Sequence, residues 1–444
     1  MGDRRRRRRL AAAITVAGLT FGTAACGSGS DSAGGGGPNT LEVWTRSNPD
    51  DAATYDRVFA AFTKKTGIKI DYQPVVNFDQ QLQSRASTKD LPDVMINDTA
   101  LMGSYQSQGL LKPIDPESIA GSDQITDKSW SSTVGLDGKH YGIPYSRQAM
   151  TLMIRKDWLR ELGLQAPTTW QEMLTVAKAF AAKDPDGDGK ADTYGMVVPG
   201  SAQNGYAAWW GASYLWQGGA KIIEPDGNGG YRPAMDSAAA VRTVTWMKDN
   251  LFCGDNGVIQ PGALTAITGN ATNFQDGNAG MYLTGPYNMT TFDGTVGKDK
   301  YEVVAAPAGP AGSDVLADGE NVYFGAKTGK TAKEQALGAF LVSPEGQKIA
   351  MTSVDGHQPV VRIPVNSTLD AAKVRDDARW SVVQKAYEHA SEQFPNAPDF
   401  APIKQDTADS LNAIFTYCGS DVSSSLKELN DTLAGDLKDQ DLLK

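Results

Sequence analysis

Residues 40–74 read TLEVWTRSNPDDAATYDRVFAAFTKKTGIKIDYQP, and their pattern decides the fold class. Residues 41–44, LEVW, have a pattern that is typical of a short strand. Four apolar residues then recur on one face of a helix, which Gly67 ends: Tyr55, Val58, Phe59 and Phe62. Residues 68–72 alternate as a second strand. The segment therefore predicts a strand, a helix and a strand in succession.

The same pattern continues along the chain. A weaker helix at 78–86 and a strand at 93–96 follow, and 150–155 with 156–162 form another strand and helix. Residues 169–172, TWQE, form a capping box that opens a further helix. Alternating strands and helices predict an α/β fold with parallel strands, whose ligand crevice lies beyond the carboxyl ends of those strands.

The first 40 residues have the layout of an export signal. Arg4 to Arg9 precede an uncharged stretch, 10–25, which is too short for a permanent membrane span. It ends in TAACG at 23–27, which resembles the lipobox of bacterial lipoproteins. That resemblance implies a signal peptide at 1–25, a lipid on Cys26 and a Gly/Ser tether over 26–39. The alternative is ordinary cleavage nearby, with Cys26 left as a free thiol.

Charge and length limit the remaining choices. The formal net charge is −10, and the only basic run lies in the signal, so a nucleic acid partner is not expected. No later apolar run approaches spanning length. The chain has 444 residues, which favours at least two domains.

Two cysteines remain after Cys26, in a compartment that permits disulfides. We expect Cys253 and Cys418 to be bridged. Two separate buried thiols are the alternative, since free cysteine is among the most buried residue types.

Five segments, taken together and in order, resemble the sugar-type extracellular solute-binding proteins (family 1) of ABC importers. They are LEVWTRSN at 41–48, LPDVMINDTALMGSYQSQGLLKPID at 91–115, GKHYGIPYSRQAMTLMIRKDWLRELGL at 138–164, NAGMYLTGPYN at 278–288 and ALGAFLVSPEGQKIA at 336–350. The resemblance covers nearly all of 40–430. Each phrase alone is common; the ordered set carries the resemblance.

The resemblance implies a two-lobed periplasmic-binding-protein-like fold with hinge crossovers and a solute bound between the lobes. Lobe 1 would hold 40–146 and 301–343, lobe 2 would hold 147–300 and 344–436, and 437–444 would be a tail. A solute that contacts both lobes only when they close would favour the closed form, and a membrane permease would then recognise that form. The chain would be a receptor and not an enzyme, with no required cofactor, and we expect a monomer on the outer face of a Gram-positive-type membrane.

A sugar offers hydroxyl groups to planar polar side chains and a ring face to aromatic ones. The family's binding loops match such residues here. The expected ligand-binding set is Arg46, Asn48, Asn97, Asp98, Arg147, Gln148, Tyr206, Trp209, Trp210, Tyr287 and Glu320. Tyr287 follows Gly-Pro, at a position where relatives commonly carry a stacking aromatic residue.

Several of these residues have structural alternatives. Trp44, which lies within the first strand, is expected in the core. Only one of Trp209 and Trp210 can reach the cleft, because adjacent helical residues do not share a face. Arg147 could instead form a salt bridge between the lobes, and Asp98 could cap the next helix.

One loop resembles the calcium loop of an EF-hand. Carboxylates stand at positions 1 (Asp184), 3 (Asp186), 5 (Asp188) and 9 (Asp192) of the loop. Gly189 is at position 6, and Lys190 offers a backbone carbonyl at position 7. Position 12 is Gly195, where a bidentate Glu is expected. A structural calcium ion remote from the sugar is one interpretation, and a solvated turn is the other.

Two other functions fit parts of the sequence. A secreted polysaccharide hydrolase also needs carboxylates and aromatic residues, although no acid pair stands out in a motif. The same fold could bind a metal, an oligopeptide or a polyamine, although three dispersed histidines do not suggest a transition-metal cluster.

Overall fold

The computed structural model describes residues 37–255, 257–326, 328–354 and 357–443. The signal segment, Cys26 and all but the end of the tether lie outside the described residues. Within the described part, no helix combines the length and the apolar character that crossing a membrane requires.

The first sheet contains both strands of the predicted strand–helix–strand segment. Its path is β12-β4-β11-β3-β1-β2, and β13 pairs with β11. The strands are β1 (Thr40–Thr45), β2 (Lys69–Pro74), β3 (Val94–Asp98), β4 (Ile143–Ala149), β11 (Val315–Phe324), β12 (Ile363–Pro364) and β13 (Ser391–Glu392). β1 is parallel to both β2 and β3, as predicted. β11, however, is antiparallel to β3 and β4, so the sheet is mixed.

The second sheet has the order β10-β5-β9-β6, and a third, two-stranded sheet pairs β7 with β8. The strands are β5 (Thr151–Arg155), β6 (Tyr194–Val197), β7 (Ile223–Pro225), β8 (Tyr231–Pro233), β9 (Ala279–Thr284) and β10 (Tyr301–Val304). Met150 alone separates β4 from β5, so the chain passes from the first sheet to the second within one residue. The segment between β10 and β11 makes the return crossing.

Strand pairing differs from the expected lobe boundaries at two points. Residues 301–343 were expected with lobe 1, but β10 pairs with β5 in the second sheet. Residues 344–436 were expected with lobe 2, but β12 and β13 pair with strands of the first sheet. The boundaries shifted because two- to four-residue strands leave almost no periodic signal in the sequence.

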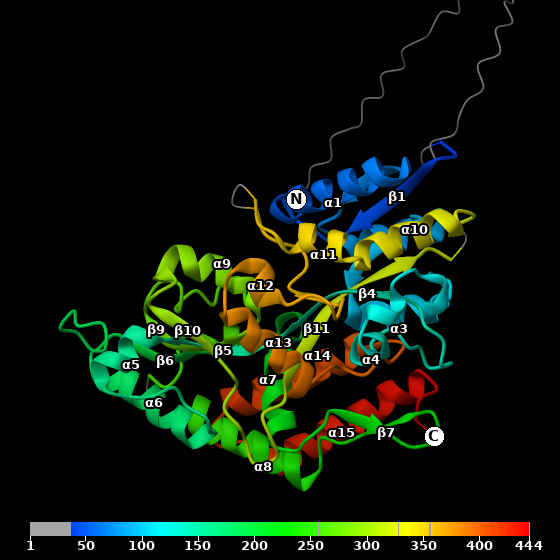
Figure 1. Cartoon of the computed structure of the whole chain (residues 1–444). Helices are drawn as coiled ribbons and strands as arrows, with labels where there is room; N and C mark the ends of the chain where they lie inside the picture. The colour runs from blue at the N-terminus through cyan, green and yellow to red at the C-terminus, as the bar shows by residue number, and fades with distance from the viewer. Residues whose placement is uncertain (1–36, 256, 327, 355–356, 444) are drawn as a thin grey trace, which may run out of the picture. The chain divides into compact units, whose positions relative to one another are not determined.

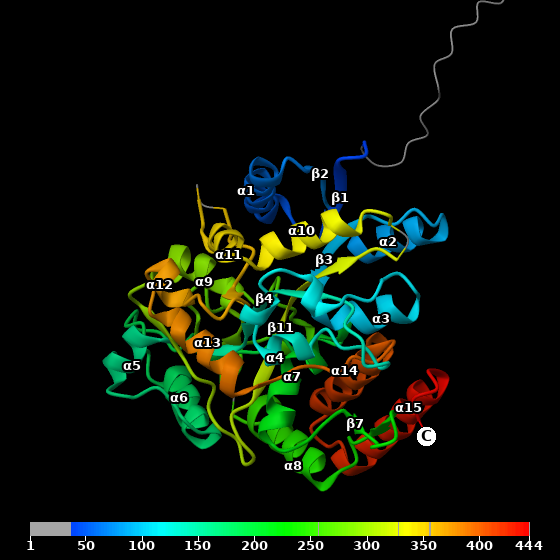
Figure 2. The ribbon, with the colours of Figure 1, turned by 45° about the vertical axis from the view of Figure 1, so that its right-hand side comes forward.

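Helices cover the sheets. They are α1 (Pro49–Thr66), α2 (Phe78–Ser87), α3 (Met102–Ser107), α4 (Asp127–Ser131), α5 (Lys156–Leu162), α6 (Trp170–Ala182), α7 (Tyr206–Gln217), α8 (Ala238–Met247), α9 (Met289–Phe292), α10 (Thr331–Val342), α11 (Pro344–Met351), α12 (Ala371–Arg375), α13 (Arg379–His389), α14 (Phe400–Thr416) and α15 (Val422–Asp439). In Figures 1 and 2, α1, α10 and α11 lie beside one another near β1. α7, α14 and α15 gather together on the other side of β11.

The core follows the sequence pattern. The four apolar residues of α1 named above are all buried, and Trp44 is buried against Phe78, as expected. The C-terminal segment differs from the tail expected at 437–444. Leu437 and Leu442 are buried, and the carbonyl of Leu442 accepts a hydrogen bond from the backbone N–H of Tyr231. The end of α15 is thus packed on β8, because its leucines continue the helix's apolar face.

The sulfurs of Cys253 and Cys418 are bonded, with the two Cα atoms 5.6 Å apart. The bridge joins the segment after α8 to the end of α14. The Lys248 ammonium donates to the carbonyls of Cys418 and Ser420 beside it. The bridge thus links segments 165 residues apart in the sequence.

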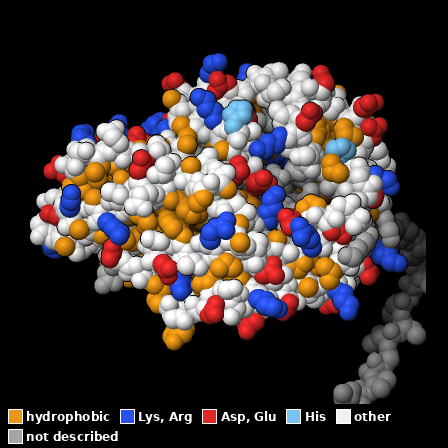
Figure 3. Space-filling view, turned by 90° about the horizontal axis from the view of Figure 1, so that it is seen from below, with side chains coloured by type: hydrophobic (Ala, Val, Ile, Leu, Met, Phe, Trp, Pro, Cys, Tyr) orange, Lys and Arg blue, Asp and Glu red, His pale blue; other side chains and the backbone are white. Residues whose placement is uncertain are grey.

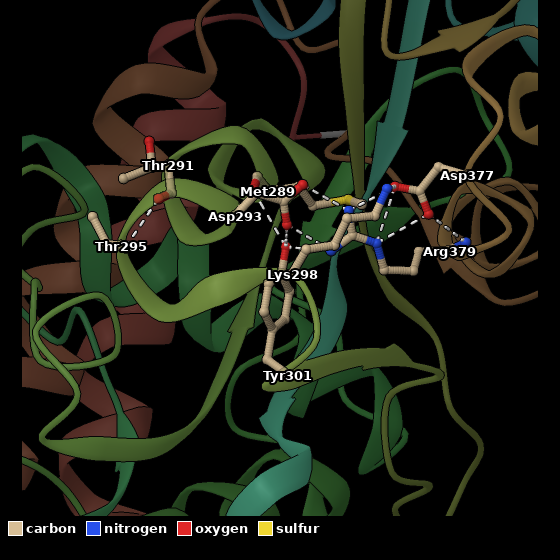
Figure 4. A network of polar contacts seen from close by, with 8 residues as sticks. All are labelled: Met289, Thr291, Asp293, Thr295, Lys298, Tyr301, Asp377 and Arg379. Atoms are coloured by element: carbon tan, nitrogen blue, oxygen red, sulfur yellow. Dashed lines mark hydrogen bonds and ion pairs between the residues drawn. The ribbon is translucent and has the colours of Figure 1, made fainter.

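A dense network of charges fixes the start of α13 (Figure 4). The guanidinium of Arg379 lies 2.7 Å from Asp293 and 2.6 Å from Asp377, and Lys298 lies 3.0 Å from Asp377. The Tyr301 hydroxyl, at the start of β10, donates to Asp293 at 2.6 Å. α13 also packs on β4 of the first sheet. The network therefore ties a helix that touches the first sheet to a strand of the second.

Candidate binding cleft

A cavity of about 720 Å³ lies where the two sheets meet. Its lining comes from the carboxyl ends of β1 and β3, from β4 and β11, and from the opposite side through α7, the turn after β9 and α14. Eight of the eleven expected ligand-binding residues line it: Arg46, Asn48, Asp98, Gln148, Tyr206, Trp209, Tyr287 and Glu320. The volume is in the range of small-molecule sites.

Arg46 and Asp98 form the ion pair of the first wall. They follow β1 and end β3, which are parallel neighbours, so the two side chains meet at one sheet edge, 2.5 Å apart. Arg46 Nε also donates to Asn97 Oδ1. The charge of Asp98 is the main cause that raises the pKa of Arg46. Asp98 makes no capping hydrogen bond to the short helix after it, so the capping interpretation was wrong.

Asp318 and Glu320 stand two positions apart on β11 and therefore face the same side of the sheet. Both are partly exposed in the cavity, and Glu320 is directly opposite Asp98 across the strand pair. Asp318 accepts hydrogen bonds from Thr99 Oγ1 and from the Gly319 N–H. Glu320 accepts one from the Tyr55 hydroxyl at 3.1 Å.

Burial and neighbouring charge raise the pKa values of these two groups. Burial, followed by the charge of Asp98, raises the pKa of Asp318 to about 6. Burial also raises the pKa of Glu320 to about 7, although the charge of Arg46 opposes the rise. Within the described residues neither carboxylate is in an ion pair, whereas Arg46 is committed to Asp98.

Aromatic rings form the opposite wall. Tyr287 follows β9 at the Gly-Pro turn, and its ring occupies the space where a Cβ on Gly285 would stand, 2.2 Å from the ring edge. Only glycine at that position allows the ring to lie there. Tyr206 and Trp209 project from the first turn of α7, with ring centroids 5.9 Å apart. The Tyr206 hydroxyl lies 3.0 Å from Thr268 Oγ1.

Three expected residues do not line the cavity. The Asn97 side chain is buried and donates to the Tyr105 hydroxyl, because it alternates with Asp98 along β3. Trp210 is buried against Tyr214, so only Trp209 reaches the cleft, as the helix geometry required.

Arg147 is the third. It is fully buried, and its guanidinium donates to five neutral oxygens on the first-sheet side: the carbonyls of Ser146, Glu320 and Ser129, Ser132 Oγ and Asn321 Oδ1. It makes neither the expected ligand contact nor the alternative salt bridge between lobes. A motif position could not tell these apart, because the acceptors come from segments up to 174 residues away.

Several lining residues were not anticipated. Alternation along β11 would have added Asp318 once Glu320 was chosen. Tyr55 was assigned to the core, and it is 1 % exposed, yet its hydroxyl reaches Glu320. Other additions come from α14 and from loop segments that do not follow a predicted strand: Arg362, Asn204, Phe394, Phe400 and Lys404.

The calcium-like loop partly fits a cation. Asp184, Asp186 and Asp188 can each bring one oxygen within 4.8 Å of the others. Burial and a hydrogen bond with Asp184 raise the pKa of Asp186. Lys190, however, places its ammonium 2.8 Å from Asp188, so a bound cation would have to displace it. Calcium at this loop stays a prediction.

Known proteins are similar to this chain in sequence. Residues 46–348 match the family model of bacterial extracellular solute-binding proteins. "Lipoprotein LipO" of Bacillus subtilis is 29% identical over 182 residues, which cover 38% of this chain and 36% of that protein. "Diacetylchitobiose binding protein DasA" of Streptomyces coelicolor is 28% identical over 253 residues, covering 54% and 56%. The chain thus spans only part of the length of these curated relatives.

The fold matches solved structures more completely. An ABC transporter solute-binding protein of Thermotoga lettingae, bound with α-D-tagatose, superposes with a TM-score of 0.74 at 18% identity, covering 90% of this chain and 99% of that one. The likeness establishes the two-lobed α/β fold. Because the family model spans more than half of the sequence, the chain belongs to the bacterial extracellular solute-binding proteins.

Proposed function

We propose that this protein is a lipid-anchored extracellular receptor that binds a carbohydrate in the cleft and delivers it to an ABC permease. One observation carries the proposal: polar side chains on one wall of the cavity face three aromatic side chains on the other. Hydroxyl groups of a sugar would bind the first wall, and its ring face would stack on the second. The bound sugars named for the relatives support the same class of solute.

Signalling to the permease would use lobe closure. The chain crosses between the two sheets at Met150 and again between β10 and β11, which gives closure a small number of hinge segments. A solute held by both walls stabilises the closed form because its contacts are complete only there. No bond in the solute is made or broken.

The test is a melting-temperature and calorimetry screen of the purified mature chain against mono-, di- and oligosaccharides. We expect a concentration-dependent rise in Tm for at least one saccharide, with the saccharide recovered intact. Recovery of cleaved products would indicate the hydrolase instead. A response to amino acids, peptides or polyamines alone would contradict the proposal.

Tyr287→Ala tests the aromatic wall directly. It should weaken saccharide binding by at least about 1 kcal/mol, because it removes a stacking face. Tyr417→Ala is the matched control, since Tyr417 is 69% exposed and is not part of the cavity lining. An unchanged affinity in Tyr287→Ala would remove this residue from the site.

Membrane attachment through Cys26 is a separate part of the proposal. The TAACG sequence, the Gly/Ser tract after it and the likeness to a lipoprotein of a Gram-positive organism support it. Cys26→Ala should move the protein from the membrane fraction to the medium of a Gram-positive host and abolish incorporation of labelled palmitate. Retention of the label by the variant would contradict the assignment.

A further inference from the structure

The first wall of the cleft carries more negative charge than it neutralises. Asp98, Asp318 and Glu320 lie at one sheet edge, and among the described residues only Asp98 is in an ion pair there, with Arg46. Arg362 also lines the cavity, and its charge opposes the rise in the pKa of Glu320, but its guanidinium donates to the Pro359 carbonyl and forms no ion pair with Asp318 or Glu320. The wall thus holds two carboxylates that receive only neutral hydrogen-bond donors.

The exposed surface differs from the cleft wall. On the face shown in Figure 3, basic and acidic side chains are interspersed across the surface. Exposed charges there are solvated and cost little. Carboxylates inside a closing cleft lose water, and each needs either a proton or a counter-charge to compensate.

A neutral solute supplies hydroxyl groups but no counter-charge. A solute with an ammonium group supplies both, and Tyr206, Trp209 and Tyr287 on the facing wall offer π-faces that also favour a cation. From the unbalanced carboxylates at the cleft wall and the aromatic rings opposite them, we infer that the solute is a saccharide bearing a protonated amine, with Asp318 and Glu320 determining that specificity.

The inference rests on the proposed function and is tested with sets of three saccharides that differ in one group. The sets are glucose, N-acetylglucosamine and glucosamine; galactose, N-acetylgalactosamine and galactosamine; and the β-1,4-linked dimers of the first set. Calorimetry at pH 6.5 measures each. In at least one set the amine should bind at least tenfold more tightly than both neutral members.

Charge is then removed from the wall without changing its shape. In Asp318→Asn/Glu320→Gln the advantage of the amine should fall below about threefold, because the amides cannot neutralise an ammonium group. A second readout needs no variant: the affinity of the wild type for the amine should fall as NaCl rises from 20 to 500 mM, and that of the neutral members should not.

The possible outcomes distinguish the inferred preference for an amine from the proposed carbohydrate receptor. Tightest binding of a neutral member in every set that binds would overturn the inference and leave the carbohydrate receptor intact. An amine advantage that persists in the double variant would remove Asp318 and Glu320 as its cause and overturn the inference as stated. Binding of no saccharide, or of spermidine alone, would overturn the proposed function and the inference together.

Discussion

The cleft wall and the network at the start of α13 hold similar charged groups in opposite balance. In the network, Arg379 and Lys298 meet Asp293 and Asp377, two cations for two carboxylates. At the cleft wall, three carboxylates stand beside two arginines, of which only Arg46 is in an ion pair among the described residues. Burial would raise the pKa of Asp377, but hydrogen bonds from Arg379 and Lys298 lower it to about 2. At the wall, burial raises the pKa of Glu320 to about 7.

The network and the cleft wall therefore use charged groups for two different purposes. A balanced network is complete without a solute, so it serves to fix one segment against another. An unbalanced wall is incomplete until a proton or a ligand arrives, which is a property of binding sites. The following predictions test that contrast, beginning with the largest effect.

Removing the arginine of the network should be costly. Arg379→Ala leaves Asp293 and Asp377 without their main partner, and the free energy of unfolding should fall by about 3 kcal/mol. Urea denaturation measures it. Lys427→Ala, which breaks the exposed pair with Asp431, is the control and should change stability by less than about 1 kcal/mol. Equal effects of the two variants would show that the network has no special role.

Removing the negative charge of Glu320 from the cleft wall should instead raise the free energy of unfolding at pH 8. The folded-state pKa of Glu320 is raised by burial to about 7, so its neutral form stabilises the fold below pH 4.5, and that contribution is lost as pH rises through 7. Glu320→Gln should therefore be more stable than the wild type at pH 8, on the order of 2 kcal/mol, and similar to it near pH 4.5. The nearby charges of Arg46, Asp98 and Arg362 are present in both proteins. Lower stability of the variant at pH 8 would contradict the unbalanced wall.

The network at the start of α13 should affect the pH dependence of stability at low pH. The pKa of Asp377 is lowered to about 2 despite burial, because Arg379 and Lys298 donate to it, so its contribution is present above pH 3.8 and is lost as pH falls through 2. Asp377→Asn should lose about 1 kcal/mol at pH 6 and show a flatter Tm profile between pH 4 and 2. Asp431→Asn, at an exposed position of α15, should leave that part of the profile unchanged.

The calcium-like loop should give the smallest effect. With a Kd of 0.1–1 mM, which is common in extracellular calcium modules, 1 mM Ca²⁺ would stabilise the fold by about 0.4–1.4 kcal/mol. The Tm of the wild type should rise with CaCl₂, return with EDTA and stay constant in Asp186→Asn. A wild-type Tm that changes with neither CaCl₂ nor EDTA would favour the solvated turn.

The sequence predicted the elements better than their grouping. Strands β1, β2 and β3 and helix α1 appear where the pattern of residues 40–98 placed them, because local periodicity follows directly from burial of one face. The short strands β12 and β13 were not predicted, and they join the first sheet from a segment assigned to the second lobe. Pairing of so few residues depends on partners distant in the sequence.

Within the cleft, eight of the residues chosen from their resemblance to the family's binding loops line the cavity. For the other three, the tertiary surroundings of the side chain decided its place. Asn97 and Asp98 are adjacent and chemically similar, but only Asp98 faces the cavity. Trp209 and Trp210 divide in the same way. Arg147 had the right chemistry for a ligand contact, and its buried acceptors became evident only when β4 and β11 were paired.

By itself, the sequence determined the α/β class, the family and the chemical types in the cleft, because apolar periodicity, ordered motifs and turn residues are local properties. It also led us to expect the disulfide between Cys253 and Cys418, which the structure contains. Only the tertiary structure decided which charges are balanced. Asp318 and Glu320 lie within β11, Asp98 ends β3 and Arg46 follows β1, and Arg379 meets Asp293 across 86 residues. Electrostatic balance depends on distance in space, which no linear pattern encodes.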